Sequence, residues 1–302
     1  MPPVVPAASS GLSFVAPVLP VLVDAPPSGE GWLHEIKHDG YRTLVALDGG
    51  RARVYTRRGH DWTDRYAGIA AAALALPCRS ALLDGEAVVQ DERGVADFHA
   101  LRRVIERGGV VVVFYAFDLL RLDGRDLCNR PLVERRAALR ELIGSDPHSP
   151  VQFSDHVEAE GAAFYAAAEA LGVEGIVSKR ADSRYRSGRS AAWQKTKCET
   201  ESEFVVVGAE PNRDGPPYAL LAREEENGLV YAGSAFVTLP LADREKFWTR
   251  SELIKTKRPV PTHGLDTRKR KVSWFKPELR VRARHLKGGD MLRHARLTAL
   301  VA

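Results

Sequence analysis

The chain has 302 residues, of which 44% are hydrophobic and 27% are charged, as is typical of globular proteins. At roughly 100–200 residues per domain, this length favours two domains. No apolar run approaches the roughly 20 residues of a membrane-spanning helix, so we expect no membrane partner. The cysteines at 78, 128 and 198 are far apart and odd in number, which argues against a disulfide framework or a structural zinc site and favours a reducing cytoplasm.

Positive charge is concentrated near the C-terminal end. The segment from Lys255 to Arg296 contains 14 lysines and arginines against three acidic residues, a net charge of +11. The whole chain carries +5, with a pI near 9.1, so the remaining residues sum to −6. Such asymmetry indicates one module that contacts a polyanion, although a solvated basic face would have the same composition.

The N-terminal stretch from Met1 to Pro17 has prolines and small residues but no basic region that would begin a signal peptide. We interpret residues 1–30 as a loose N-terminal arm that leads into the first domain.

Residues 31–200 alternate short apolar runs with turns marked by glycine and aspartate. The runs predict strands at Leu44–Leu47, Ala81–Leu83, Val110–Leu120 and Gly175–Ser178. Helical spacing of apolar residues predicts helices at Ile69–Leu76, Leu132–Ile143 and Ala162–Leu171. Helices interleaved with antiparallel-looking strands indicate the α+β class.

The pattern changes near residue 200, where short strands follow one another with tight turns. They are predicted at Glu203–Gly208, Tyr218–Arg223, Gly228–Gly233, Val272–Phe275 and Leu279–Ala283. About five short strands in a hundred residues favour a small β-barrel such as an OB fold. We therefore place the domains at 31–200 and 201–302, with Glu199–Ser202 as the linker and candidate hinge.

A candidate nucleophile lies in the sequence EIKHDGYR, which runs from Glu35 to Arg42. The Lys37 amine attacks phosphorus only in its neutral form, which nearby cations favour. Gly40 would let the backbone turn close to a nucleotide, and Arg42 offers a planar fork to phosphate or sugar oxygens. A lone lysine in a turn is more often an ordinary surface residue, and His38 is interpreted as a bystander.

Two well-separated carboxylates, Glu86 and Glu174, follow apolar runs beside Gly85 and Gly175. Such a pair can hold Mg²⁺ against phosphate oxygens. Taken singly, each would be interpreted as a surface acid, but the placement at strand ends favours the metal site.

Lys195 and Lys197 alternate along a strand-like run, so both point to one face. Two ammonium groups there could neutralise an α-phosphate in a transition state. The alternative is a solvated strand edge protected by lysine. Phe117, in an otherwise aliphatic strand, would by itself be interpreted as a core residue.

Taken in order, these segments resemble the motifs of the nucleotidyltransferase superfamily of DNA ligases, RNA ligases and capping enzymes. The matching segments are KHDGYR (37–42), TRRG (56–59), LDGE (83–86), YAFDLL (115–120), EGIVSK (174–179) and WQKTK (193–197). From about Gly31 onward the chain most resembles the ligase module of bacterial end-joining ligase D and its short stand-alone relatives.

The resemblance implies a nucleotidyltransferase (adenylation) domain followed by an OB-fold β-barrel. It implies that Lys37 carries AMP from ATP, that Phe117 stacks on the purine, and that Glu86 and Glu174 hold Mg²⁺ or Mn²⁺. The nucleotide-binding residues expected from the motifs are Glu35, Ile36, Lys37, Arg42, Arg57, Glu86, Phe117, Glu174, Lys195 and Lys197.

The resemblance also implies a three-step reaction. AMP is loaded on the lysine, moves to the 5′-phosphate of a nick, and leaves when the 3′-hydroxyl attacks that phosphate. The expected substrate is nicked or broken double-stranded DNA, met in repair or non-homologous end joining. We expect a monomer in the bacterial cytoplasm, associated with the nucleoid, and an end-binding protein of the Ku type as a partner.

Contacts to DNA are expected from two basic segments. Arg57 and Arg58 resemble the family segment that grips the nucleotide sugar and the nick. Arg268, Lys269, Arg270 and Lys271 precede two aromatic residues and would suit a barrel surface that tracks phosphates. The alternative for the second segment is a charged loop in front of two core aromatics.

The resemblance departs from the family pattern after LRHARL (292–297), where TALVA lacks the aspartate and lysine of an RxDK-like sixth motif. We therefore expect ATP-driven self-adenylation to be more affected than sealing of a preformed adenylate. The alternatives are an RNA ligase or capping-type guanylyltransferase, which shares the lysine motif, and a catalytically weak nick- or end-binding protein.

Overall fold

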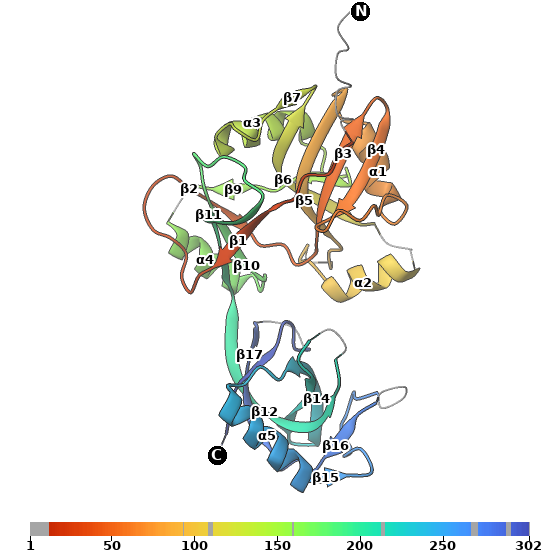
Figure 1. Cartoon of the computed structure of the whole chain (residues 1–302), viewed down its shortest axis with the longest axis vertical. Coiled ribbons are helices and arrows are strands. Elements are labelled where there is room, and N and C mark those ends of the chain that lie inside the picture. Colours follow the sequence, from red (N-terminus) through yellow and green to blue (C-terminus); the bar gives the residue numbers. More distant parts are fainter. Residues whose placement is uncertain are drawn as a thin grey trace, which may run out of the picture. The chain divides into compact units, whose positions relative to one another are not determined.

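The computed structural model describes residues 12–92, 94–107, 111–158, 160–212, 215–266, 271–287 and 291–301. It contains two compact units, a first that ends at Lys197 and a second that begins at Cys198 (Figure 1). Within the ranges described, no helix is both long and apolar enough to span a membrane.

The first unit is built on two sheets that share no strand. One has the order β4-β3-β5-β6-β7, with β8 paired to β6: β3 Tyr41–Asp48, β4 Arg51–Thr56, β5 Ser80–Val88, β6 Val113–Leu122, β7 Arg125–Asp126 and β8 Val151–Phe153. The other has the order β1-β11-β10-β2-β9: β1 Val18–Leu22, β2 Trp32–Ile36, β9 His156–Val157, β10 Gly175–Arg180 and β11 Gly188–Lys197.

The middle strands of the first sheet bury both faces, which explains their continuous apolar runs. Val45 and Leu83 belong to a core formed with helix residues, whereas Leu44 and Leu82 pack with residues of the second sheet such as Leu33. Two apolar layers therefore hold the β3-β5-β6 sheet between helices and the second sheet.

Helices cover the outer faces of both sheets. α1 (Ala67–Leu74) packs on β4 and β3, α3 (Leu132–Ile143) on β6 and β8, and α4 (Gly161–Ala170) on β10 and β2. The predicted helix at Leu132–Ile143 has the observed bounds, and the other two predicted helices are displaced by only one or two residues. α2 (Phe98–Arg107), absent from the prediction, has the sequence FHALRRVIER, which is rich in arginine instead of alanine and leucine.

The N-terminal segment differs from the expected loose arm. Val18–Leu22 forms β1, which pairs in parallel with β11, and Leu12 is buried with only 8% of its surface exposed. A parallel pairing across about 170 residues leaves no local signal beyond one short apolar run, so the sequence pattern could not place this strand.

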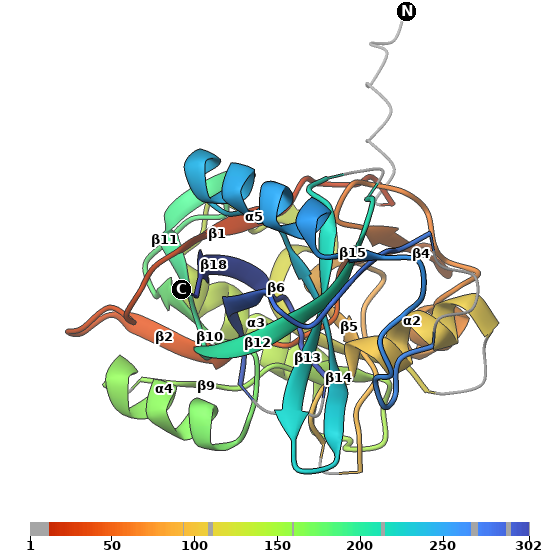
Figure 2. The same ribbon diagram turned by 90° about the horizontal axis from the view of Figure 1, so that it is seen from below.

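The second unit contains a closed ring of five strands, with the pairing order β12-β13-β14-β18-β17 and back to β12. Its strands are β12 Glu199–Glu210, β13 Tyr218–Glu225, β14 Gly228–Phe236, β17 Arg280–Leu286 and β18 Arg296–Leu300. α5 (Leu241–Leu253) follows β14 in the chain (Figure 2). Its Phe247 belongs to the barrel core. β15 (Lys255–Thr256) and β16 (Ser273–Phe275) extend the sheet beside β12. This ring is an OB-type barrel, and the predicted fold class is confirmed.

The expected linker is part of this barrel. Glu199–Ser202 forms the beginning of β12 and pairs with the end of β17, from Leu286 back to Ala283. The polar residues ETES begin a strand whose later residues are buried, so they are paired and do not form a loose linker. The boundary between the two units lies just before them, between Lys197 and Cys198, and the hinge stays a prediction.

Candidate active site

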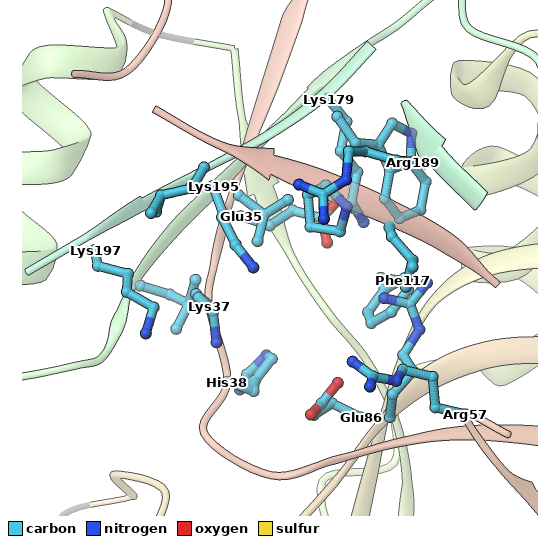
Figure 3. A pocket seen from close by; sticks show the side chains of 17 residues that line it. Glu35, Lys37, His38, Arg57, Glu86, Phe117, Lys179, Arg189, Lys195 and Lys197 are labelled. Atoms are coloured by element: carbon cyan, nitrogen blue, oxygen red, sulfur yellow. The ribbon is translucent and has the colours of Figure 1, made fainter. Parts of the chain in front are cut away.

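A pocket of about 520 Å³ opens in the first unit, and residues from both sheets line it (Figure 3). β2, β10 and β11 contribute one wall, and β6, β5 and the turn after β4 contribute the opposite side. The predicted residues that line this pocket are Glu35, Ile36, Lys37, Arg42, Arg57, Glu86, Phe117, Lys195 and Lys197.

One face of the second sheet carries most of the charged groups. Directly across the strands, Val177 of β10 lies between Glu35 of β2 and Lys195 of β11. Residues directly opposite one another point to the same face of a sheet, so Glu35 and Lys195 share this wall. Just beyond β2, the backbone N–H of Lys37 donates to the carbonyl of Gly175 at 2.9 Å, which places the lysine at the end of the same wall.

Three lysines and one carboxylate gather at this end. The Lys37 Nζ contacts Glu174 Oε2, and the Lys197 Nζ lies 3.5 Å from Glu174 Oε1. Burial and the charges of Lys37 and Lys197 lower the pKa of Lys195. Glu174 is 4% exposed, so its buried carboxylate can hold the amine of Lys37 in place. Glu174 does not line the pocket itself but lies behind the two lysines.

Gly175 makes this arrangement possible. Its φ of 150° is rarely adopted by other residues, and a Cβ there would lie 2.1 Å from the carbonyl oxygen of Thr196 on β11. Any side chain would push β10 away from β11 and displace the neighbouring Glu174 from Lys37.

Gly40 allows a close approach of two backbone segments. A Cβ at this position would lie 2.2 Å from the carbonyl oxygen of Ala87. The glycine therefore allows the loop that follows Lys37 to approach the backbone at the end of β5.

Glu35 is held by two cations. Its Oε1 lies 2.9 Å from Arg136 Nη1 and 2.7 Å from Lys179 Nζ, and all three side chains are 2% exposed. Burial lowers the pKa of Lys179 to about 8, although the charge of Glu35 opposes this shift. Because these two cations keep the carboxylate from rotating, Glu35 presents a hydrogen-bond acceptor in a fixed position at the pocket wall.

Phe117 forms the opposite, aromatic side. Its ring is 7% exposed and meets the Trp193 ring edge-on, with 6.0 Å between centroids. The Lys179 Nζ lies 4.0 Å from the Phe117 centroid and 4.3 Å from that of Trp193. The cation contacts both π-systems and fixes the two rings at the pocket.

Arg42 does not extend its fork toward open space as expected. Its Nε and Nη2 each donate to a carboxylate oxygen of Asp84 at 2.6 Å, and its guanidinium lies 4.5 Å from the Phe117 centroid. Asp84 is fully buried, so this pair is internal. Arg42 therefore lines the pocket while its fork is used to bind Asp84.

Glu86 fits the expected cation site. Burial raises its pKa to about 7, with Lys37 and Arg42 opposing the shift and Glu174 adding to it. A half-buried carboxylate that faces the pocket and is costly to ionise is suited to a divalent cation, which would supply the missing positive charge. Glu174 is already engaged by two lysines and would contribute to metal binding only by changing these contacts.

His38 is more than a bystander, because it lines the pocket. Its ring stacks on Tyr115 with 4.4 Å between centroids and an interplanar angle of 10°. Burial lowers the pKa of His38 to about 4, so the imidazole is neutral and adds no positive charge beside Lys37.

The expected DNA-binding residues are only partly described. Arg57 lines the pocket, and Arg58 is exposed in the same turn after β4. Lys271 is exposed just before β16, whereas Arg268, Lys269 and Arg270 lie outside the described residues.

Sequence reasoning missed the pocket residues Lys179, Arg189 and Trp193, as well as Val177 and the β1 residues Leu19, Pro20 and Leu22. Lys179 shares the alternation of Gly175 and Val177 along β10, which is the same signal that identified Lys195 and Lys197 on β11. That signal could have identified it once β10 had been extended to its observed end at Arg180.

Comparison with known proteins agrees with this geometry. A family model described as the ATP dependent DNA ligase domain matches residues 25–197. The multifunctional non-homologous end joining protein LigD of Pseudomonas aeruginosa is 38% identical over 246 residues, which cover 79% of this chain and 29% of that protein. A probable DNA ligase of Streptomyces coelicolor is 38% identical over 219 residues, 66% of this chain and 43% of the relative.

Among solved structures, the ligase domain of Mycobacterium tuberculosis LigD is 29% identical, with a TM-score of 0.57 and coverage of 95% of this chain and 94% of that one. A mycobacterial DNA ligase D complexed with ATP and MES is 30% identical, with a TM-score of 0.58 and the same coverage. The chain spans less than half the length of the curated relatives named above. Because the ligase-domain model matches more than half of its residues, the chain belongs to the ATP-dependent DNA ligase family.

Proposed function

We propose that this chain is a DNA ligase domain that takes AMP from ATP on Lys37 and seals nicks between a 5′-phosphate and a 3′-hydroxyl. The observation that carries the proposal is the convergence of Lys37, Glu174 and Lys197 at one end of a pocket lined by Glu35 and Phe117. This arrangement provides a nucleophile, a buried carboxylate that holds it and neighbouring cations, as phosphoryl transfer needs.

Lys37 is the proposed nucleophile. The neutral amine attacks the α-phosphorus of ATP, a P–N bond forms, the P–O bond to pyrophosphate breaks, and the lysine nitrogen gives up its protons to solvent. Lys195 and Lys197 are placed to neutralise the negative charge that develops on the α-phosphate oxygens. Their fixed positions on β11 mean that little reorganisation is needed during the step.

Glu35 and Phe117 are the proposed nucleoside contacts. The Phe117 ring offers an apolar platform for a purine, and Ile36 and Arg57 complete the lining around it. The Glu35 carboxylate is held by Arg136 and Lys179 and can only accept hydrogen bonds. An acceptor at this position favours the amino group of adenine over the carbonyl oxygen of guanine, in agreement with the use of ATP.

Glu86 and Glu174 are the proposed ligands of Mg²⁺ or Mn²⁺. The cation would offset the charge of the phosphates during transfer. Glu86, whose pKa is raised by burial, would hold it on the pocket side opposite the lysines.

The later steps use DNA. We propose nicked or broken double-stranded DNA as the substrate, with Arg57 and Arg58 near the reacting strand and the 268–271 segment on DNA phosphates. The names of the LigD relatives support a place in end joining. A Ku-type end-binding protein is the partner we propose for that process. We propose a monomer that works at the nucleoid in the cytoplasm.

The test is sealing of a 5′-labelled nicked duplex with ATP and Mg²⁺. The wild type should seal it, and Lys37→Ala should fail with ATP but still seal a nick that is already adenylated, because that step forms no bond to Lys37. RNA nicks in parallel reactions distinguish an RNA ligase. No sealing of DNA by the wild type, whether or not the nick is adenylated, would contradict the proposal.

A further inference from the structure

The N-terminal strand β1 borders the pocket. Leu19, Pro20 and Leu22 line it, and Leu22 is a large apolar side chain with 54% of its surface exposed. Leu22 pairs with Lys195 and therefore lies on the same face of the sheet as Glu35. Exposure of this apolar side chain to water is unfavourable. A ligand that fills the pocket would cover it and so gain free energy of binding.

β1 is shaped around the pocket and does not simply extend the sheet. Pro20 pairs with Ser190, but the next residue, Val21, pairs with Gln194. Residues 191–193 of β11 therefore have no partner on β1, and they include Trp193, which pairs with Lys179 of β10 and lines the pocket. Beyond the irregularity, the N–H of Val23 donates to the carbonyl of Lys195 at 3.1 Å.

A closed ring of buried hydrogen bonds anchors the start of β1. The N–H of Val18 donates to the hydroxyl of Tyr185 at 3.3 Å, and that hydroxyl donates to Asp84 Oδ2 at 2.6 Å. Asp84 accepts from Arg42, and Arg42 Nη2 donates to the carbonyl of Val18 at 3.3 Å. The N–H and the carbonyl of Val18 are thus both connected by hydrogen bonds to the Arg42–Asp84 pair, in which Arg42 lies against Phe117.

Tyr185 is the neutral member of this ring. It is 3% exposed, and burial together with the charge of Asp84 raises the pKa of its hydroxyl, which keeps its proton and donates it to the carboxylate. Hydrogen bonds to a buried charge are among the stronger ones, so removing this hydroxyl should loosen both Asp84 and β1.

We propose that β1 is a wall of the nucleotide pocket that contacts the nucleoside, and that Tyr185 is the positioning residue that holds β1 and Arg42 in place. This inference rests on the proposed function, because it assumes that the pocket takes ATP. Tyr185 acts through Asp84 and Val18 and does not itself line the pocket.

The first test is Tyr185→Phe, which removes one oxygen and keeps the ring against Trp193. Formation of the enzyme–AMP adduct is followed with labelled ATP over a range of concentrations. We expect the KM for ATP to rise about 10-fold, the size of a lost hydrogen bond to a charged group, with kcat within about 3-fold. Tyr231→Phe, which removes a hydroxyl 3.0 Å from Ser234 in the barrel, is the matched control and should leave KM unchanged.

The second test is Leu22→Ser, which changes an exposed side chain and should leave folding intact. The KM for ATP should rise about 3-fold because apolar contact with the nucleoside is lost. Leu171→Ser, at a leucine that is 66% exposed away from the pocket, is its control.

An unchanged KM for ATP in both variants overturns the inference, and so does an effect confined to sealing of a pre-adenylated nick, which would assign β1 to DNA. Failure of the proposed function gives a different result. In that case Lys37→Ala would label as strongly as the wild type, or the wild type would not label at all.

Discussion

The two units place their charges differently. In the first, alongside exposed pairs such as Arg140 with Asp155, several ion pairs are buried between the layers: Arg135 with Asp118 and Arg136 with Glu35 have side chains at most 2% exposed. In the barrel, Arg282 and Glu203 pair across the neighbouring strands β17 and β12, and Arg280 of β17 reaches Glu224 of β13 on the far side of β12. These pairs lie on the surface, and each side chain is about half exposed.

This difference indicates where the molecule needs fixed geometry. Buried pairs cost desolvation and add little net stability, but they hold each side chain in one position. Surface pairs contribute little to stability. Their lysine and arginine side chains remain able to leave the carboxylate and bind a phosphate instead. The first unit thus has a preformed pocket, and the barrel has adaptable cations suited to a polyanion of varied sequence.

Stability should show the largest contrast. Arg135→Met breaks a pair in which Arg135 also donates to the carbonyls of Arg130 and Ser183. Leaving Asp118 buried without its partner should cost about 3–5 kcal/mol. Arg282→Met, the same change at a surface pair, should cost about 0–1 kcal/mol. Urea unfolding of both variants measures this, and equal losses would remove the contrast.

The pocket carboxylate should give an intermediate effect that depends on pH. Burial raises the pKa of Glu86 to about 7, so the carboxylate that binds metal is the minor form at pH 6 and the major form at pH 8. At limiting metal, the affinity for Mn²⁺ should therefore rise about 10-fold from pH 6 to pH 8, because the ionisation of this single carboxyl controls binding. Titration of Mn²⁺ by its paramagnetic signal checks this.

Glu86→Gln should flatten the Mn²⁺ profile, since the amide does not ionise. A variant that keeps the wild-type profile would assign the ionisation to another group, such as Lys195, whose pKa is lowered.

The smallest effect is expected on the barrel. Lys271→Ala should weaken nick binding a few-fold and reduce the slope of log affinity against log salt by about 1, the value for one lost phosphate contact. Fluorescence anisotropy with a labelled nick at several salt concentrations measures both quantities. An unchanged slope would remove Lys271 from the DNA surface, and Lys246→Ala on α5 provides a comparison at another exposed lysine.

The sequence predicted features that local patterns encode. Leu132–Ile143 has helical spacing, and Lys195 and Lys197 alternate as a strand requires, so both were placed correctly. The order of the short motifs indicated the family, which the ligase-domain match confirms. Five short strands with tight turns were enough to indicate the barrel.

What the sequence could not predict depends on contacts between distant segments. The fork of Arg42 was expected to face the ligand, but a buried carboxylate next to it in space, Asp84, binds it. β1 was assigned to a loose arm because its partner lies about 170 residues away, and Gly40 was interpreted from its motif without the Ala87 carbonyl that requires it. The roles assigned to individual pocket residues stay predictions.

The central claim is that Lys37 is the residue that carries AMP, and mapping the labelled adduct tests it most directly. The protein is incubated with α-labelled ATP and Mg²⁺, denatured, and digested to peptides, and the acid-labile label is located by mass spectrometry. We predict AMP on Lys37 and no adduct in Lys37→Ala. An adduct of normal yield on another lysine, such as Lys195 or Lys197, in that variant would contradict the account.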